Sequence, residues 1–201
     1  MDFGKRITFR QFNFSIHNNV YEPAEDTFLI AHNIRASKND IVLDIGTGCG
    51  ILAIIASEQA KSVDAIDINP HAIRCAEENA KRNCVENIDF HLGDFFETNL
   101  KKVFSLILFN PPYLPSSNPE KKNWLEKAWA GGKNGRTIID RFITDAPNFL
   151  SDVGQVLMVQ SSLSDISRTI RNFKKAGLGA RIRYILSFPF ERIALIEASY
   201  L

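Results

Sequence analysis

The alternation of short apolar runs with helix-like segments from residue 41 onward limits the possible fold more than any other feature. Strands separated by helices at this spacing form a parallel sheet with right-handed crossovers. Only residues 187–191 join the last two strands, which is too short for a crossover helix, so these strands are expected to form an antiparallel hairpin. The sequence therefore predicts an α/β fold: a doubly wound, mostly parallel seven-stranded sheet with an antiparallel C-terminal hairpin. The predicted strands are 41–45, 63–68, 88–92, 104–109, 155–160, 181–187 and 192–198. The predicted helices are 27 to about 36, 51–59, 70–83, 137–150 and 165–176.

Length and composition favour one domain over residues 1–201, with a short N-terminal β extension over about 1–19. Residues 3–16 alternate apolar and polar side chains, which is typical of a half-exposed hairpin. A net charge of +1 gives no general attraction to nucleic acid or membrane, and no apolar stretch approaches the roughly 20 residues of a membrane span. The N-terminus lacks the apolar core of a signal peptide. Three cysteines without CxxC spacing and four scattered histidines suggest neither a disulfide framework nor a metal site. We expect a cytoplasmic protein without a bound metal.

The stretch Asn110-Pro111-Pro112-Tyr113 directly follows the apolar run that predicts the strand 104–109. Two consecutive prolines end a strand, because proline lacks an N–H and restricts the residue before it. An amide, two rigid rings and an aromatic side chain are therefore expected at the carboxyl end of a central strand. In open α/β sheets, ligands bind at that edge.

A glycine-rich loop follows the first strand of the alternating region, within residues 41–50 (IVLDIGTGCG). Gly46 and Gly48, with Thr47 between them, permit a tight turn and leave helix N–H groups free for a ligand. The spacing is G-x-G-x-G, not the G-x-G-x-x-G of dinucleotide binders. Asp44, at the strand end before the loop, would repel a pyrophosphate but suits an ammonium group. These two differences favour a cofactor that carries an amino acid over NAD.

Acidic residues also end the next two strands. Asp67 lies 21 residues beyond Gly46, where a carboxylate can accept both hydroxyls of a ribose. Asp94 and Phe95 follow the third strand and could bind the amine and the ring of adenine. Each acidic residue taken alone is an ordinary turn or cap residue. Together with the glycine loop they predict an adenosine that bears an amino acid, which is S-adenosylmethionine.

Methyl transfer from a sulfonium gives Asn110 a chemical role. An amide or aromatic amine nitrogen is a poor nucleophile because its lone pair is delocalised. The Asn110 side-chain oxygen and the Pro111 carbonyl can accept the two N–H bonds of such a nitrogen and orient it, while Tyr113 stacks on the planar group. No strong base or metal is required. The alternative, a turn that merely ends the strand, is ordinary Asn-Pro chemistry.

The glycine loop and Asn110-Pro111-Pro112-Tyr113 together resemble those of class I, Rossmann-like methyltransferases that modify planar nitrogens. Residues 20–27 (VYEPAEDT) and 128–136 (AWAGGKNGR) are similar to segments of the short archaeal and eukaryotic branch of the HemK-like family. The match extends from about residue 20 to 145. The resemblance implies methylation of the glutamine in the Gly-Gly-Gln loop of a class 1 translation termination factor. It also implies that Asn110, Pro111 and Tyr113 hold the glutamine, with Pro112 as part of the same catalytic stretch. The cofactor residues that it implies, together with those next to them, are Tyr21, Thr27, Asp44, Gly46, Thr47, Gly48, Asp67, Ile68, Asp94, Phe95 and Asn110.

The resemblance further implies a small zinc-ribbon activator that adds a strand beside the sheet, at the edge strand near residues 88–96.

Three alternatives stay open: a nucleic-acid amine methyltransferase acting on adenine or tRNA, a protein-lysine methyltransferase, and a non-catalytic cofactor-binding subunit. Residues 119–141 and 166–183 are rich in Lys and Arg and are either solvated faces or contacts with RNA or an acidic partner. The segment 114–136 is expected to be a long functional loop.

Overall fold

A computed structural model of the chain describes residues 4–98, 100–116 and 123–201. Residues 117–122 of the predicted loop, which include Lys121 and Lys122, lie outside the described residues. Among the described residues, no helix is both long and apolar enough to cross a membrane.

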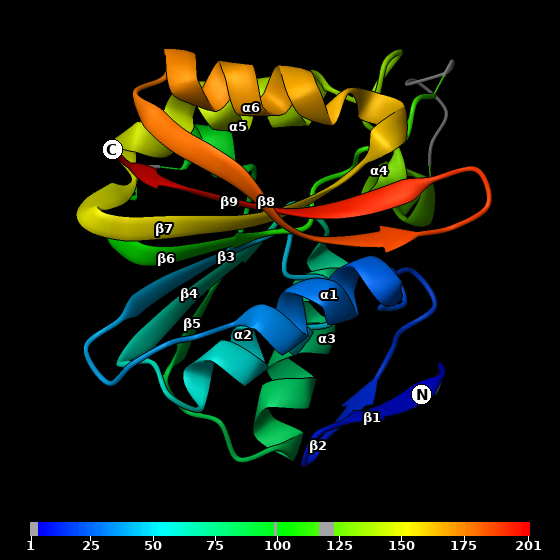
Figure 1. The fold of residues 1–201 in the computed structure, drawn as a ribbon. Helices are drawn as coiled ribbons and strands as arrows, with labels where there is room; N and C mark the ends of the chain where they lie inside the picture. The colour runs from blue at the N-terminus through cyan, green and yellow to red at the C-terminus, as the bar shows by residue number, and fades with distance from the viewer. Residues whose placement is uncertain (1–3, 99, 117–122) are drawn as a thin grey trace.

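The predicted seven-stranded sheet is confirmed, in the order β5-β4-β3-β6-β7-β9-β8 (Figure 1). Strands β3 to β7 pair in parallel, whereas β9 pairs antiparallel with both β7 and β8. The chain first builds outward from β3 to β5 and then returns to place β6 on the other side of β3. The carboxyl ends of β3 and β6 therefore meet at the topological switch point where open α/β sheets bind ligands. The strands are β3 (Ile41–Ile45), β4 (Ser62–Asp67), β5 (Ile88–Leu92), β6 (Phe104–Phe109), β7 (Leu150–Ser161), β8 (Leu178–Ser187) and β9 (Arg192–Tyr200).

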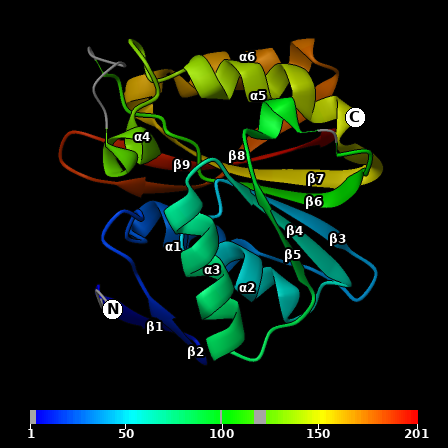
Figure 2. The ribbon, with the colours of Figure 1, turned by 180° about the vertical axis from the view of Figure 1, so that it is seen from behind.

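Helices cover both faces of the sheet, and each face has its own apolar core. Figures 1 and 2 show α1, α2 and α3 on one side and α5 and α6 on the other. The strands alternate their side chains between the two cores: Val42 packs on the α1–α3 side and Leu43 on the α5–α6 side. The helices are α1 (Glu25–Asn33), α2 (Ile51–Ser57), α3 (Pro70–Arg82), α4 (Trp124–Trp129), α5 (Thr137–Asp145) and α6 (Ile166–Lys175).

Several elements differ from the sequence prediction: α1 spans Glu25–Asn33 instead of about 27–36, β7 begins at Leu150 instead of 155, and β8 begins at Leu178 instead of 181. Helix α5 ends at Asp145 instead of 150, because Pro147 lacks the N–H that another helical turn would need, and the chain enters a 3-10 turn before β7. The expected loop 114–136 contains the short helix α4, whose N-cap Asn123 accepts a hydrogen bond from Glu126 N at 2.9 Å.

The predicted N-terminal extension is a separate two-stranded sheet, β1 (Arg6–Phe9) and β2 (Phe12–Ser15), that packs on α3. Asn79 on α3 binds the β2 backbone as another strand would. Its Oδ1 accepts from Ser15 N at 2.8 Å, and its Nδ2 donates to Ser15 O at 3.0 Å and Cys49 O at 2.9 Å. Asn83, one turn later, makes the same pair of bonds to Asn13 at an exposed position.

The Asn79→Ala variant is expected to lose about 2–3 kcal/mol of unfolding free energy, because several buried backbone groups lose their partner at once. The matched Asn83→Ala variant should lose less than about 1 kcal/mol, since water replaces its exposed bonds. Urea unfolding followed by circular dichroism measures both. Equal losses would show that the burial of the Asn79 contacts contributes nothing.

Candidate active site

A cavity of about 910 Å³ opens at the carboxyl ends of β3, β4 and β6. Its wall contains every site residue predicted from the sequence except Asp44. The predicted residues on the wall are Tyr21, Thr27, Gly46, Thr47, Gly48, Asp67, Ile68, Asp94, Phe95, Asn110, Pro111, Pro112 and Tyr113. Segments that are distant in the chain, from Val20 to Ile138, meet there, because the carboxyl ends of parallel strands lie at one edge of the sheet.

The glycine loop turns through left-handed backbone at Gly46 (φ 69°) and Gly48 (φ 59°), a region that residues with a Cβ rarely adopt. The N–H groups of Gly46 and Thr47 both donate to Ile66 O, which ties the loop to β4. At Gly50 the reason for glycine is packing, since a Cβ there would lie 2.9 Å from Cβ of Ala76 on α3. The loop is therefore held from two sides and leaves the Gly46 Cα facing open space.

Asp44 lies beneath this loop, fully buried, and not on the cavity wall. Its Oδ2 accepts from Thr47 Oγ1 at 2.7 Å and from Ala53 N at 3.1 Å, whereas Oδ1 has no hydrogen-bond partner among the described residues. Burial raises the pKa of Asp44 to about 7. The carboxyl group supports the loop from below, and its contact with a ligand ammonium group stays a prediction.

Asp67, the last residue of β4, binds the backbone of the glycine loop. Its Oδ2 accepts from Gly48 N and its Oδ1 from Asn69 N, both at 2.9 Å. Burial raises the pKa of Asp67 in spite of these bonds. A carboxylate has about four lone-pair sites, so acceptor capacity for two further donors remains. Ile68, next to it, is an exposed apolar residue on the cavity wall.

Asp94 and Phe95 form the wall beyond Asp67. Asp94 Oδ1 caps the following 3-10 turn by accepting from Phe96 N at 2.9 Å. The Phe95 ring is buried against Phe142 and Phe149, so the same ring lines the cavity and anchors the α5 side of the core. Phe95 therefore offers apolar surface to the cavity, and its contact with an adenine ring stays a prediction.

Asp26 is a site residue that the sequence analysis did not identify. Its buried carboxylate accepts from Asn110 Nδ2 at 3.1 Å and from Tyr113 Oη at 2.7 Å, both through Oδ2. Thr27 Oγ1 also accepts from Asn110 Nδ2 at 3.1 Å. Both partners of Nδ2 are oxygen atoms, so the amide nitrogen faces α1 and the amide oxygen is the atom left for another donor. A sequence signal existed, because Asp26 lies four residues before the buried Ile30 and therefore on the apolar face of α1.

Both tyrosines of the site stay protonated. Burial, and then the Asp26 carboxylate, raise the pKa of Tyr21 and Tyr113 far above the ordinary value, with a smaller contribution from Glu191 at Tyr113. The Tyr21 hydroxyl also donates to Asp26, at 3.3 Å. Each hydroxyl is a hydrogen-bond donor to Asp26 and not a base.

The segment around residue 131 pairs with the chain just after Tyr113. Leu114 N donates to Trp129 O, and Gly131 N donates back to Leu114 O, both at 2.9 Å. A Cβ on Gly131 would lie 2.5 Å from Pro112 O, so only glycine permits this approach. This ladder holds the Pro-Pro turn against α4.

Arg136 fastens the other end of this segment to the sheet. Its buried guanidinium donates to the carbonyls of Ser164 and Asp165 beyond β7 and pairs with Asp140 at 2.7 Å. Arg136 is buried and is not among the residues that line the cavity, so it supports the fold of the site. Sequence similarity had marked the stretch 128–136 without indicating this role.

The fold and the site together define the chain as a class I methyltransferase. Among solved structures, it superposes on a chain of the E. cuniculi Mtq2–Trm112 complex, whose title describes it as responsible for the methylation of the eRF1 translation termination factor. The TM-score is 0.70, with 23% identity over 91% of this chain and 99% of that one. It also superposes on Methanocaldococcus jannaschii TYW2 in complex with AdoMet, with a TM-score of 0.69 and 17% identity over 98% and 86% of the two chains. At these identities the likeness shows the fold.

Sequence comparisons show the family. The model of the methyltransferase small domain matches residues 16–127. A Methanocaldococcus jannaschii protein named as a protein N5-glutamine methyltransferase is 46% identical over 91% of this chain and 93% of its own length. The human protein named methyltransferase HEMK2 is 34% identical over 80% of each chain. The chain therefore belongs to the methyltransferase small-domain family, in its HemK-like protein-glutamine methyltransferase branch.

The raised pKa of Asp44 gives a prediction about stability. The native pKa of about 7 lies above the unfolded value of about 3.9, so the native state binds more protons between these values. Stability from this group is fully present below about pH 4 and is lost as the pH rises through 7. The neutral Asp44→Asn variant avoids this loss. We therefore compare the Tm of the variant minus the Tm of the unmodified chain at two pH values. This difference should be larger at pH 8 than at pH 5 by about 3 °C or more, the shift that roughly 1 kcal/mol produces.

Differential scanning fluorimetry measures these Tm values, with the exposed Asp89→Asn variant as the matched control. If the Asp44→Asn difference is the same at both pH values, the buried carboxyl does not titrate as described.

Proposed function

We propose that this chain transfers the methyl group of S-adenosylmethionine to the side-chain amide nitrogen of the glutamine in the Gly-Gly-Gln loop of a class 1 translation termination factor. The observation that carries the proposal is the orientation of Asn110, whose nitrogen is held by Asp26 and Thr27 so that its oxygen is left for a substrate N–H. The names of the HemK-like relatives and of the Mtq2 complex support the same substrate class. We further propose that residues 1–201 act as a single domain and work in the cytoplasm, where termination occurs.

The residues that line the cavity support S-adenosylmethionine as the cofactor. Gly46 and Gly48 leave open space where other residues would place a Cβ, so the amino-acid portion can lie against the loop backbone. Asp67 has acceptor capacity for the ribose hydroxyls, and Ile68 and Phe95 offer apolar surface to an adenine ring, with Asp94 as the acceptor beside it. When bound, the cofactor supplies an electrophilic methyl group on a sulfonium.

The acceptor side of the site consists of Asn110, Pro111, Pro112 and Tyr113. Asn110 Oδ1 and the Pro111 carbonyl accept the two N–H bonds of the glutamine amide, which orients the nitrogen lone pair along the transfer axis. Because the glutamine nitrogen is the donor in both hydrogen bonds, these bonds also stabilise the positive charge that develops on it as the new bond to the methyl group forms. The Pro-Pro turn holds both acceptors rigidly, and Tyr113 provides a planar surface against the amide.

The proton of the methylated nitrogen leaves after transfer, so no base of high pKa is needed. Asp26 already accepts hydrogen bonds from Asn110 and Tyr113, and its role is to hold these groups in place. The nearby negative charge adds favourable electrostatics for the cationic nitrogen.

We propose that a second protein binds at β5, the edge strand at the other end of the sheet from β8. Strand β5 is an edge strand, as predicted, and Leu92 at its carboxyl end is 59% exposed. Free strand edges with apolar side chains are docking sites for an added strand. A small zinc-ribbon activator that pairs with β5 would cover this edge and stabilise the Asp94–Phe95 side of the cavity.

The central test offers labelled S-adenosylmethionine to the chain, with and without the activator. The acceptors are a termination factor, its Gln→Asn variant in the Gly-Gly-Gln loop, tRNA, DNA and a lysine-rich histone. Label is expected on the factor alone and not on its variant, with higher solubility and turnover when the activator is co-expressed. Label confined to nucleic acid or to lysine would contradict the proposed substrate.

The Asn110→Ala variant is expected to lose about 10²–10³-fold in kcat, since it removes an acceptor aimed at the reacting nitrogen. Its cofactor Kd, measured by isothermal titration calorimetry, should change by less than about tenfold. Substantial remaining turnover would remove Asn110 from the mechanism.

The Asp26→Asn variant is expected to lower kcat about 10²-fold, because its amide cannot accept from Asn110 and Tyr113 as a carboxylate does. The control is Tyr21→Phe, which removes only the longer bond to the same carboxylate and should cost less than about tenfold. Single-turnover kinetics separate the chemical step from product release. Equal effects of the two variants would show that Asp26 does not position the acceptor groups.

A further inference from the structure

Strand β8 is the other free edge of the sheet, and it is exposed over most of its length. It pairs with β9 on one side and with no strand among the described residues on its other side. Residues 181–185 and Ser187 are all exposed, and Leu186 is half-buried. Figure 1 shows β8 on the front of the molecule, with α6 above it and α1 below it.

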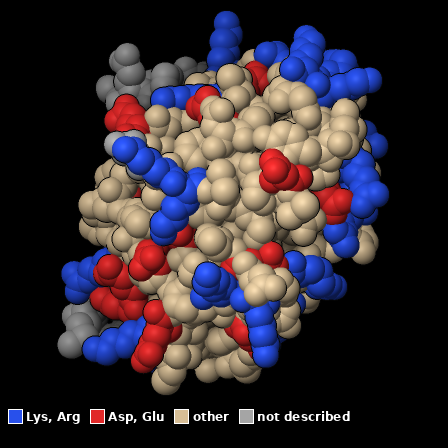
Figure 3. All heavy atoms as spheres, turned by 90° about the vertical axis from the view of Figure 1, so that its left-hand side faces the viewer, with Lys and Arg blue, Asp and Glu red and all other residues tan. Residues whose placement is uncertain are grey.

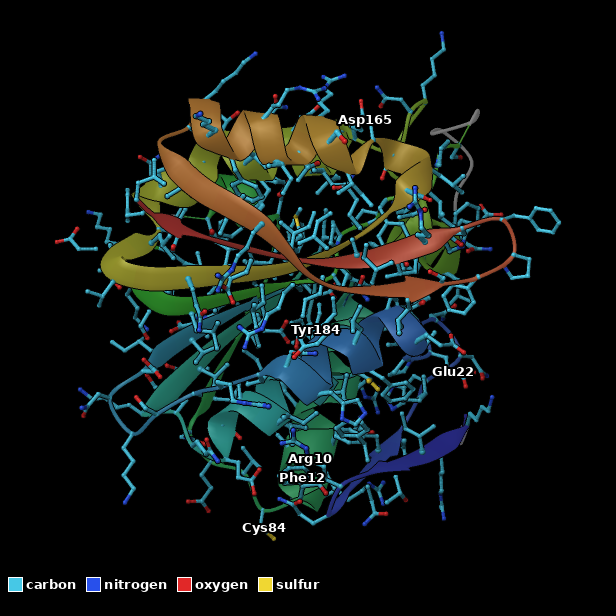
Figure 4. The ribbon with its side chains drawn as sticks, in the orientation of Figure 1. Arg10, Phe12, Glu22, Cys84, Asp165 and Tyr184 are labelled. Carbon is cyan, nitrogen blue, oxygen red and sulfur yellow. The ribbon has the colours of Figure 1, made fainter. Side chains whose placement is uncertain are left out.

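Apolar side chains are exposed on both faces of β8. Ile182 and Ile185 pair with Ile196 and Ala194 of β9, which belong to the core on the α5–α6 side. Tyr184 pairs with Leu195, which belongs to the core on the α1 side, and Figure 4 shows Tyr184 between the hairpin and α1. The three side chains are 43–51% exposed. A strand that ends a sheet normally presents polar residues on such positions, so β8 has the composition of a strand with a further neighbour.

The charged residues of β8 do not block its free edge. Edge strands are often protected by charges that project across the unpaired backbone. Here the guanidinium groups of Arg181 and Arg183 both bind the Glu197 carboxylate on β9, so they lie over the face of the sheet and point away from the edge. The unpaired N–H and C=O groups of β8 therefore stay accessible to an extended chain.

The surroundings of β8 are basic. Residues 166–183 contain six Lys and Arg residues and no acidic residue, and among the described residues Glu197 is the carboxylate that pairs with β8. Lys174 and Lys175 are exposed at the end of α6, directly before the strand. In Figure 3, blue Lys and Arg spheres gather at the upper right, the side on which α6 and β8 lie. This charge favours an acidic occupant.

The position of β8 connects it to the catalytic cavity. It runs antiparallel to β9, which is antiparallel to β7, so β8 points in the same direction as the parallel strands. Its carboxyl end at Ser187, and the exposed Phe188 and Phe190 beyond it, therefore lie at the edge of the sheet where the cavity opens. A strand added outside β8 would be about 19 Å from β6, a distance that roughly six extended residues span.

We propose that β8 is the docking strand for the protein substrate: an extended acidic segment of the substrate pairs with its free edge while the acceptor glutamine enters the cavity. The inference rests on the proposed function, because it assigns this surface to the same substrate. Main-chain hydrogen bonds supply affinity, and the apolar side chains on both faces of β8 with the surrounding Lys and Arg residues select the segment. The docking segment and the glutamine, if on one chain, are separated by at least about six residues.

Two other occupants fit less well. A second copy of the chain would bring two basic surfaces together, with the exposed Lys174 and Lys175 on each, and like charges oppose association. RNA would use the guanidinium groups, but those of Arg181 and Arg183 are already paired with Glu197, and the backbone edge and Ile182 offer nothing specific to a phosphate chain.

The test compares the Tyr184→Glu and Ile185→Glu variants with the Val153→Glu control, which places the same charge on a 93% exposed apolar position of β7. For the intact termination factor, both β8 variants should raise KM about tenfold or more with kcat and cofactor Kd unchanged. For a short Gly-Gly-Gln peptide that lacks the docking segment, KM should stay the same. The Val153→Glu control should match the unmodified chain with both substrates.

Binding of fluorescently labelled factor, followed by anisotropy, gives a readout that does not depend on turnover. Equal KM and Kd values in all variants would overturn the docking strand while leaving the proposed function intact. Absence of labelling of both factor and peptide by the unmodified chain would instead overturn the proposed function. Two further outcomes would overturn the docking proposal. In one, the β8 variants convert a dimer to a monomer in analytical ultracentrifugation without weakening binding of the factor. In the other, they weaken binding of a single-stranded RNA oligonucleotide but not of the factor.

Discussion

The buried carboxylate of Asp26 is the point on which the geometry of the active site depends. It belongs to α1, yet it accepts hydrogen bonds from Asn110 and Tyr113, which are more than 80 residues later in the sequence. One acceptor-only group thus decides which atom of the Asn110 amide is left for the substrate. A carboxylate in this position would be costly without donors, and the site supplies them from two tyrosines, an asparagine and the Thr27 backbone. The same bonds that compensate for its burial give the site its shape.

The rest of the site depends on how the chain is supported behind the reacting groups. Gly131 approaches the Pro112 carbonyl more closely than a residue with a Cβ could. Arg136 ties this segment to the end of β7 through two backbone carbonyls. On the cofactor side, Asp44 supports the glycine loop from beneath, and Asp67 holds it from the side. Several conspicuous charged residues therefore orient the backbone around the site.

The two ends of the sheet have different characters, and this difference organises the proposed assembly. Strand β5 ends the sheet on the cofactor side, close to Asp94 and Phe95, where an activator would stabilise the cavity wall. Strand β8 ends it on the other side, in basic surroundings, where its carboxyl end reaches the cavity edge. An enzyme that modifies one glutamine of a large protein needs contacts beyond the reacting amide, because the amide itself carries little information. A free strand edge beside the cavity provides such contacts.

The sequence by itself determined the parallel sheet, the antiparallel hairpin, the edge position of residues 88–92 and the place of every predicted site residue except Asp44 on the cavity wall. These features follow from local patterns: apolar runs define strands, and residues at the carboxyl ends of parallel strands must meet at one edge. Only the tertiary structure decided three matters. It placed Asp44 beneath the loop, it brought Asp26 to Asn110 and Tyr113, and it used Arg136 as a brace. The physical reason is that hydrogen bonds between residues distant in the chain depend on how α1 and the segment around residue 131 pack against the sheet, and local periodicity contains no record of that packing.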